Sequence, residues 1–181
     1  MIAAIVDAVA AFPADEALAL GVPGDDERAD LTEELAVIRE LVVPRLDGAT
    51  AGDLVRRWER HLADDLLFAY QPGLVHGDLS LDHLLVDGGR IVGLIDFGDT
   101  NVTDTDLEFG YLWAEAGREF VARVQSHRGR VVDDVLATKL DFFHIRDEAA
   151  DVRWAVEYGL GDLLEPAVAA LTETLRIRRV R

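Results

Sequence analysis

The sequence of 181 residues contains no cysteine and a single lysine, Lys139. Without cysteine the chain has no disulfide, no zinc–thiolate site and no cysteine nucleophile. This composition is typical of a reducing compartment, and we expect a cytoplasmic protein. Long apolar runs are missing too: the N-terminal run 1–12 is interrupted by Asp7 and is too short to cross a bilayer. We therefore expect neither a signal peptide nor a membrane anchor.

Positive charge is scarce in this chain. Lys and Arg total 18 against 35 Asp and Glu, which gives a formal net charge of −17. Binding to nucleic acid requires a basic surface, so we expect no nucleic-acid partner. The acidic excess suits a cationic small-molecule substrate, although solubility alone explains most of the carboxylates. The basic C-terminal end is expected to stabilise the dipole of a terminal helix and contains Arg176, Arg178, Arg179 and Arg181.

Apolar residues at helical spacing dominate both ends of the chain. The first such run is predicted to end at Pro13, because proline cannot continue a helix. Capping-box patterns mark several of the later starts, where Ser, Thr or Asp precedes Glu or Asp by three residues. The predicted helices begin near Ile2, Asp30, Thr50, Thr105, Val132 and Asp162.

The centre of the chain has a different pattern. Apolar runs at 83–86 and 91–95 are joined by Asp87-Gly88-Gly89-Arg90, which predicts a β-hairpin with a tight turn. Leu74 and Val75 indicate a short strand before it. No internal repeat or long linker interrupts the sequence. We predict an α+β, mainly helical fold with a central hairpin, forming a single domain over residues 1–181.

Two short motifs flank the predicted hairpin. His76-Gly77-Asp78-Leu79, followed by His83, precedes it, and Asp96-Phe97-Gly98-Asp99 follows it. A strand–loop–hairpin–loop arrangement would bring Asp78, His83 and Asp96 to one end of the hairpin, with Asp99 close by. Several acids in one partly buried pocket are costly without a cation, so we expect a metal ion or a perturbed pKa there.

These motifs resemble the protein-kinase signature, in which H-R-D-L-x-x-x-N is followed by D-F-G. Gly77 in place of the arginine, within Val75-His76-Gly77-Asp78, resembles the aminoglycoside phosphotransferase family of small-molecule kinases. The specific motifs are confined to residues 74–107. The resemblance implies the C-terminal lobe of a protein-kinase-like fold, with a catalytic core over about 70–107 and a helical subdomain from the flanking segments.

The resemblance also implies a reaction. The chain would be part of a transferase that moves a phosphoryl group from ATP or GTP to a hydroxyl of an aminoglycoside-type antibiotic, and so confers resistance. Asp78 would orient the attacking hydroxyl or accept its proton. His76 would brace the loop rather than take part in chemistry, and Asp99 would support the site from behind the reacting groups.

The metal would be bound by Asp96 and His83. A carboxylate suits Mg²⁺, which bridges the nucleotide phosphates in this chemistry. His83 stands where the kinase signature has asparagine, and imidazole suits transition metals such as Mn²⁺ better than Mg²⁺. The alternative is a histidine packed beside the hairpin, with Asp82 or water contacting the metal.

Contacts with substrate ammonium groups are expected from acids on the helices after the metal loop. The resemblance places acids there, and a solvated helix face is the alternative for each. The candidates are Glu108 and Glu157 first, together with Glu115, Asp147 and Glu148. Trp154 could line a sugar pocket, although large aromatic residues at helical spacing more often lie in a core.

The nucleotide-clamping parts of the kinase signature are missing. Neither G-x-G-x-x-G nor G-x-x-x-x-G-K occurs, and Lys139 follows the metal motif on a predicted helix. We therefore expect the N-terminal lobe to be absent and this chain alone to be inactive. A degenerate kinase-like module that binds without turnover is the alternative function. A metallohydrolase is a poorer match, since it would need more histidines near the acids.

Overall fold

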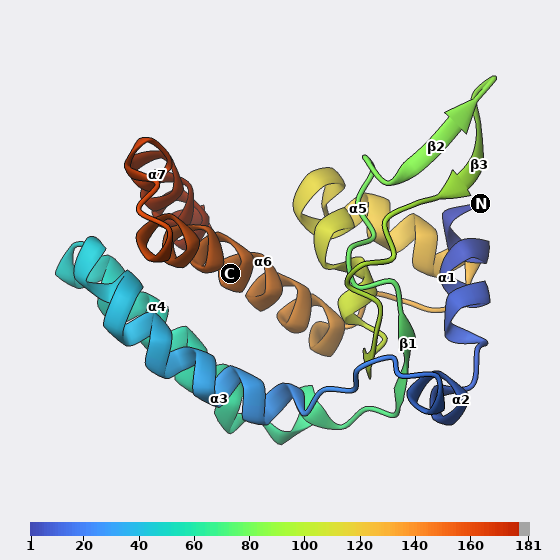
Figure 1. Ribbon diagram of the computed structural model, residues 1–181, viewed down its shortest axis with the longest axis horizontal. Coiled ribbons are helices and arrows are strands. Elements are labelled where there is room, and N and C mark those ends of the chain that lie inside the picture. The colour runs from blue at the N-terminus through green and yellow to red at the C-terminus, as the bar shows by residue number, and fades with distance from the viewer. Residues whose placement is uncertain (178–181) are drawn as a thin grey trace. The chain divides into compact units, whose positions relative to one another are not determined.

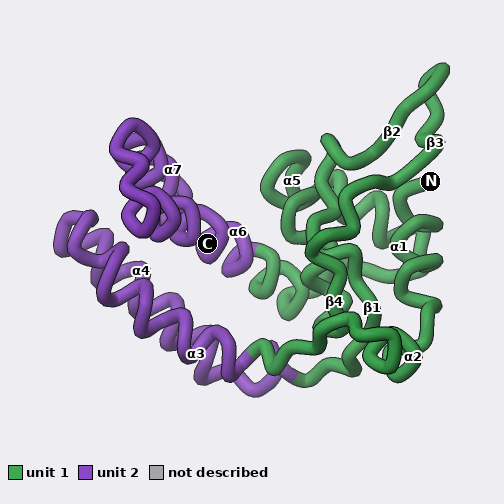
Figure 2. Tube along the Cα trace, in the orientation of Figure 1, with its two compact units in different colours: residues 1–27, 69–140 green, residues 28–68, 141–181 purple. Residues whose placement is uncertain are grey.

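The computed structural model describes residues 1–177 and forms two compact units. The first consists of residues 1–27 and 69–140, and the second of residues 28–68 and the chain from residue 141 onward (Figure 2). Helix α6 (Asp134–Glu157) contributes to both. A single domain over 1–181 stays a prediction, and Arg178, Arg179 and Arg181 of the basic end lie outside the described residues.

The first unit combines short N-terminal helices with short strands and a longer helix (Figure 1). Its elements are α1 (Ile2–Ala10), α2 (Ala14–Ala19), β1 (Pro72–Val75), β2 (Leu84–Asp87), β3 (Arg90–Leu94), β4 (Asn101–Asp104), the 3-10 turn η4 (Leu107–Phe109) and α5 (Gly110–His127). Helix α1 covers the predicted apolar run and ends before Pro13, as the sequence predicts. Periodicity does not predict α2 or β4, because elements of six and four residues are too short to show it.

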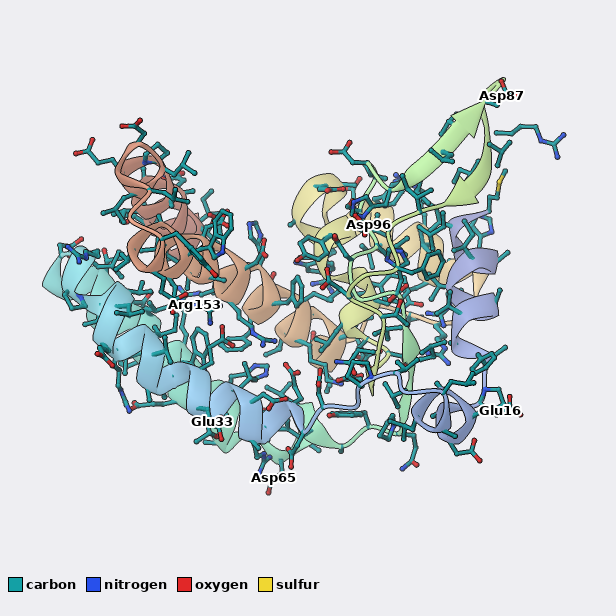
Figure 3. All side chains as sticks on the ribbon, in the orientation of Figure 1. Glu16, Glu33, Asp65, Asp87, Asp96 and Arg153 are labelled. Carbon is teal, nitrogen blue, oxygen red and sulfur yellow. The ribbon has the colours of Figure 1, made fainter. Side chains whose placement is uncertain are left out.

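Strands β2 and β3 form the predicted hairpin. They pair antiparallel, with Leu84 opposite Leu94 at the base. The turn residues Gly88 and Gly89 have φ of 53° and 76°, and a two-residue turn of this kind needs positive φ at both positions. Glycine adopts this conformation without strain. Asp87 marks the tip of the hairpin in Figure 3.

A second ladder brings the two motif loops together. Strand β1 pairs antiparallel with β4, so that Val75 lies opposite Asn101. Loop 76–83, which follows β1, therefore begins beside the end of loop 95–100, which precedes β4. The hairpin joins the same two loops at their other ends, where the Ile95 backbone N–H donates to the His83 oxygen at 3.1 Å. The two loops are thus tied together at both ends.

The apolar core of the first unit includes a residue of the first motif loop. Leu79 is 1% exposed and belongs to one cluster with Phe109, Leu112 and Val6. Burying a leucine of this kind contributes roughly 1.5–3 kcal/mol. The core therefore anchors loop 76–83 through Leu79, one residue after Asp78.

Helix α5 begins later than the sequence predicts. Thr105 with Glu108 has the spacing of a capping box, but the chain first forms η4, and α5 begins at Gly110. The predicted cap is wrong because the Glu108 carboxylate accepts hydrogen bonds from loop 76–83 instead. Within α5, Gly117 has φ 80° and ψ 175°, which kinks the helix. This backbone conformation is open almost only to glycine.

The second unit is built mainly from helices. Its elements are α3 (Glu27–Val37), the π-helical turn η1 (Ile38–Val42), the 3-10 turns η2 (Val43–Arg45) and η3 (Asp65–Phe68), α4 (Gly48–Ala63), the remainder of α6, and α7 (Gly161–Ile177). The predicted stripes of α3 and α4 meet in one buried cluster that includes Leu31, Leu54 and Trp58. Within residues 1–177, no helix combines the length and apolarity needed to span a membrane.

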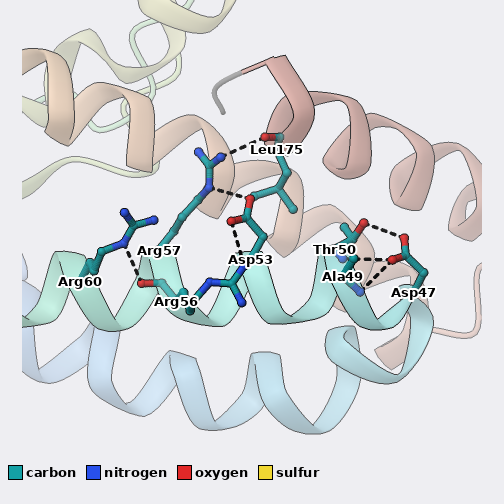
Figure 4. Close-up of polar contacts among 8 residues, drawn as sticks. All are labelled: Asp47, Ala49, Thr50, Asp53, Arg56, Arg57, Arg60 and Leu175. Carbon is teal, nitrogen blue, oxygen red and sulfur yellow. Dashed lines mark hydrogen bonds and ion pairs between the residues drawn. The ribbon is translucent and has the colours of Figure 1, made fainter. Parts of the chain in front are cut away.

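The starts of α3 and α4 differ from the predictions. Asp47 caps α4: its Oδ1 accepts from the backbone N–H groups of Ala49 and Thr50 at 2.9 and 3.1 Å (Figure 4). The predicted cap at Thr50 is wrong, because Asp47 satisfies these amides one turn earlier. The predicted start of α3 at Asp30 is also wrong, since the helix already begins at Glu27.

Arg57 connects α4 to the end of α7. Its Nε donates to Oδ2 of Asp53 at 3.0 Å, and its Nη2 donates to the backbone oxygen of Leu175 at 3.0 Å (Figure 4). The last carbonyls of a helix lack partners within it, and a basic side chain is favourable there. Arg57 therefore links two helices of the second unit, because it donates to a backbone carbonyl of α7 while it remains paired with Asp53 of α4.

Candidate active site

His76 links the two motif loops. Its side chain is fully buried; Nε2 lies 2.9 Å from the backbone oxygen of Ile95, and Nδ1 lies 3.3 Å from the backbone nitrogen of Asp78. A carbonyl only accepts and an amide N–H only donates, so Nε2 acts as the donor and Nδ1 as the acceptor. The ring also packs edge-on against Phe97, with centroids 4.6 Å apart. Both nitrogens are engaged, which fits a bracing role.

Gly77 allows the two loops to approach each other. Its φ is 87°, and a Cβ atom at this position would overlap the backbone carbonyl of Asp99. Only glycine combines this conformation with so close a backbone contact. The structure thus gives a steric reason for glycine between His76 and Asp78.

Asp78 and His83 face each other across loop 76–83. Nδ1 of His83 lies 2.7 Å from the backbone oxygen of Asp78 and 3.5 Å from its Oδ2. Partial burial raises the pKa of the Asp78 carboxyl above its ordinary value, and the nearby His83 opposes this shift. The hydrogen bond to the Asp78 carbonyl raises the pKa of His83. The two groups therefore titrate under each other's influence, as expected for a reactive cluster.

Asp96 lies on the other side of the His83 ring. Its Oδ2 is 3.9 Å from Nε2 of His83, and its side chain is 65% exposed. Asp96 has a φ of 65° and is the sole non-glycine residue with positive φ among residues 1–177. Such a conformation costs roughly 1–3 kcal/mol and tends to occur at functional positions. Figure 3 shows Asp96 beyond the base of the hairpin, at the end opposite to Asp87.

His83 and Asp96 are residue types that bind divalent metal ions, and their side chains lie 3.9 Å apart. Because Nδ1 of His83 donates to a backbone carbonyl, Nε2 keeps its lone pair, which is how metal-binding histidines are commonly oriented. In the described part of the chain, no group of three or more His, Asp or Glu side chains is placed to hold a metal. In proteins, Mg²⁺ commonly keeps several waters and is bound by one or two carboxylates together with phosphate oxygens.

Glu108 contacts loop 76–83 from the interior. It is 4% exposed, and its Oε2 accepts from the backbone N–H groups of His76 and Gly77 at 2.9 and 3.4 Å. Burial raises the pKa of Glu108 to about 7, although the two hydrogen bonds and Arg128 oppose the shift. Its contact with substrate ammonium groups stays a prediction, and its carboxylate accepts hydrogen bonds from the loop backbone.

Lys139 lies in a buried ion cluster. Its Nζ is 2.5 Å from Oδ2 of Asp104 and 2.9 Å from Oδ2 of Asp106. The Lys139 and Asp104 side chains are 5% and 4% exposed. The only lysine of the chain therefore ties α6 to the end of β4 and to the turn after it, and its charge is already compensated.

The second unit contains a separate cavity of about 330 Å³ between α6 and α7. Trp154 is 52% exposed at this cavity, so it is not a core residue. Glu157, our second candidate for substrate contacts, lies near the end of α6 and pairs with Arg153 at 3.7 Å. The cavity is lined by Asp151, Trp154, Ala155, Leu163, Pro166, Ala167 and Ala170.

Most of the predicted site residues thus come together in the first unit. Asp78, His83 and Asp96 converge as expected, with His76 and Asp99 beside them. Glu157 belongs to the second unit. Sequence reasoning did not single out Asp151 of the cavity. It named Glu115 only as a candidate for substrate contacts, whereas in the structure Glu115 accepts from the Leu81 backbone N–H.

Comparison with known proteins gives consistent results. Residues 1–137 match the model of the phosphotransferase enzyme family. An aminoglycoside 3'-phosphotransferase of Escherichia coli is 33% identical over 85 residues, which cover 46% of this chain and 31% of that protein. The wild-type aminoglycoside 2'-phosphotransferase-IIIa in its GDP complex superposes with a TM-score of 0.92 at 26% identity, over 98% of this chain and 60% of that one.

Two further structures extend this likeness. The GDP and kanamycin complex of APH(2")-IIIa gives a TM-score of 0.91 at 28% identity, covering 96% of this chain and 60% of that chain. Macrolide 2'-phosphotransferase type I gives 0.76 at 25% identity, covering 94% and 57%. The chain thus spans about three fifths of the length of these structures. The predicted α+β, mainly helical, kinase-like fold is confirmed.

Proposed function

This chain belongs to the phosphotransferase enzyme family, and from that premise we propose that it carries the acceptor- and metal-binding part of a kinase-like enzyme that phosphorylates a hydroxyl of a small molecule. The observation that carries the proposal is the convergence of Asp78, His83 and Asp96 on two loops tied together at both ends. Phosphoryl transfer depends mainly on positioning and charge stabilisation, and this arrangement supplies both.

Asp78 orients the acceptor hydroxyl and accepts its proton. Its raised pKa makes it a better proton acceptor than an ordinary aspartate. Asp96 and Nε2 of His83 hold the divalent cation, Mg²⁺ or Mn²⁺, that accompanies the nucleotide. When bound, this cation neutralises charge on the phosphates of ATP or GTP. His76 braces the two loops, and Asp99 supports the site from behind the reacting groups.

The proposed acceptor is a cationic small molecule of the aminoglycoside type. The net charge of −17 favours such a ligand. The related structure with kanamycin supports an amino sugar. Within this chain, the α6–α7 cavity combines the carboxylate of Asp151 with the exposed ring of Trp154, a pairing that suits an ammonium-bearing ring. Glu157 remains our second candidate for ammonium contacts.

A second lobe, on another segment or chain, is proposed to fix the nucleotide phosphates. Lys139 is committed to Asp104 and Asp106, so these 181 residues offer no other lysine for this task. The same observation favours one alternative function, a kinase-like module that binds metal and ligand without turnover. The cytoplasmic location expected from the lack of cysteine stays a prediction.

Activity measurements separate these two functions. The purified chain is mixed with ATP or GTP, Mg²⁺ and kanamycin, and phosphate transfer is followed by mass spectrometry. We expect no transfer by the chain alone, and transfer once a nucleotide-clamping lobe is supplied by fusion. Binding of kanamycin that weakens with salt, and that is reduced in Asp151→Asn, would support the substrate class. Failure of the fused protein to modify any amine-bearing alcohol would favour the binding module.

A further inference from the structure

Two glutamates hold loop 76–83 by its backbone at either end. Near the start of the loop, Oε2 of Glu108 accepts from the N–H groups of His76 and Gly77. Near its end, Oε2 of Glu115 accepts from the N–H of Leu81 at 2.9 Å. Asp78 lies between these two attachment points. Glu108 lies in η4 and Glu115 in α5, which follows directly, so one continuous segment contacts the loop at two points.

We propose that Glu108 and Glu115 are positioning residues that together fix the loop carrying Asp78, and so set where its carboxylate stands relative to an acceptor. The inference rests on the proposed function, because the position of Asp78 matters for turnover only if Asp78 acts on a substrate. Hydrogen bonds from backbone N–H to an ionised carboxylate are roughly twice as strong as neutral ones. Small displacements of a catalytic group lower rates strongly.

The two attachments differ in their surroundings. Glu115 is exposed, whereas Glu108 is buried and its Oε1 has no hydrogen-bond partner in the described part of the chain. The neutral acid can therefore carry its proton on Oε1 while Oε2 still accepts from the loop. With a pKa of about 7, Glu108 changes charge near neutral pH. The hydrogen bonds from the His76 and Gly77 N–H groups to Glu108 strengthen as pH rises through this value, because the ionised carboxylate is the stronger acceptor.

The charged groups around Glu108 do not cancel this response. Arg128, at the end of α5, acts on Glu108 and is itself paired with Asp7 of α1 at 2.7 Å. Both ring nitrogens of His76 are engaged with backbone groups, of Ile95 and of Asp78.

Nuclear magnetic resonance of the ¹⁵N-labelled full chain tests the proposal. The backbone amide shifts of His76 and Gly77 are followed from pH 5 to 9 in the wild type and in Glu108→Gln, which keeps an acceptor of the same shape. We expect a titration with a midpoint near 7 that is lost in the variant. We also expect these amides to exchange roughly fivefold faster in Glu108→Gln above pH 7, since a charge-assisted bond becomes a neutral one.

Glu115→Ala tests the other attachment, with Glu119→Ala on the same helix as the matched control. Leu81 amide exchange should be roughly tenfold faster in Glu115→Ala, because the acceptor is removed, and unchanged in Glu119→Ala. A positioning role also predicts that the carboxyl ¹³C shift of Asp78 moves in Glu108→Gln and Glu115→Ala but not in the control. A merely structural role would leave that shift in place.

The outcomes separate this inference from the proposed function. Absence of the neutral-pH titration in the wild type, or wild-type Leu81 exchange in a folded Glu115→Ala, overturns the positioning role. If Glu108→Gln does not fold, the wild-type titration and the Glu115 variant still decide. Calorimetry with Mn²⁺ and GDP tests the proposed function separately: no binding would contradict it while leaving the amide results intact.

Discussion

Nδ1 of His83 donates a hydrogen bond to the backbone oxygen of Asp78 at 2.7 Å, so the same ring turns Nε2 toward Asp96 at 3.9 Å. This contact fixes the tautomer that a metal ligand needs, and it joins the residue proposed for proton transfer to the residues proposed for metal binding. It also argues against the alternative in which His83 merely packs beside the hairpin, because packing alone does not require Nε2 to face the Asp96 carboxylate.

Metal binding should depend unequally on the two ligands. Asp96→Ala should abolish divalent-metal binding in the presence of nucleotide, because it removes the only carboxylate of the pair. His83→Ala should weaken binding by roughly tenfold or more. His83→Asn should restore much of it and shift the preference from Mn²⁺ toward Mg²⁺, because an amide oxygen is a harder ligand. Calorimetric titrations with both metals provide the measurement, and unchanged affinity in Asp96→Ala would contradict the site.

Metal affinity should also fall in acid. Protonated imidazole cannot bind a metal, and the hydrogen bond to the Asp78 carbonyl raises the pKa of His83 above its ordinary value. Affinity should therefore already be declining as pH drops through that raised pKa. In His83→Asn this dependence near neutral pH should disappear. Repeating the Mn²⁺ titrations from pH 5.5 to 8.5 tests this, and parallel pH profiles for the two proteins would show that His83 is not a ligand.

Asp78→Asn should separate binding from turnover. In a protein that includes a nucleotide-clamping lobe, the variant should keep nearly normal nucleotide affinity while kcat falls on the order of a hundredfold or more, since general-base and orienting roles act in the transition state. Steady-state kinetics measures kcat, and calorimetry measures the nucleotide affinity. Wild-type kcat in this variant would place the catalytic base elsewhere.

Stability should depend on pH through Glu108. Its pKa of about 7 in the folded chain exceeds its ordinary value of 4.5, so between these values the folded state binds a proton that the unfolded state has lost. The contribution is fully present below about 4.5 and is lost as pH rises through 7. Over this window the wild type should lose on the order of a few kcal/mol relative to Glu108→Gln. Urea unfolding at several pH values measures this difference.

Breaking the buried ion cluster should be costly. Lys139→Met leaves Asp104 buried without its main partner and should lower the free energy of unfolding by roughly 3–5 kcal/mol. Arg39→Met is the matched control, because Arg39 and Glu59 form an exposed pair that is worth less than about 1 kcal/mol. Adding Asp104→Asn to Lys139→Met should recover part of the loss. Equal effects of Lys139→Met and Arg39→Met in urea unfolding would show that the cluster is not effectively buried.

Short-range patterns in the sequence were sufficient for the hairpin and for the two motif loops. Asp87-Gly88-Gly89-Arg90 fixes a turn because both glycines must take positive φ, and the apolar runs on either side form β2 and β3. Helix starts were less predictable: Asp47 and Thr50 are both acceptable caps, and only the fold decides which one meets the free amides. Strand β4 depends on pairing with β1, a contact between residues about thirty positions apart.

The tertiary structure determined which groups the acidic side chains near the site contact. Glu108 and Glu115 look like residues of a solvated helix face, and nothing local shows that their carboxylates meet the backbone of a loop about thirty residues earlier. The same holds for Lys139, whose partners Asp104 and Asp106 are distant in sequence. The sequence alone determined which residues are proposed for metal binding and proton transfer, because these proposals depend on residue type and spacing. How deeply each of these groups is buried, and which groups it contacts, is set only when separate segments pack together. Burial and contacts in turn determine the charge that the group carries.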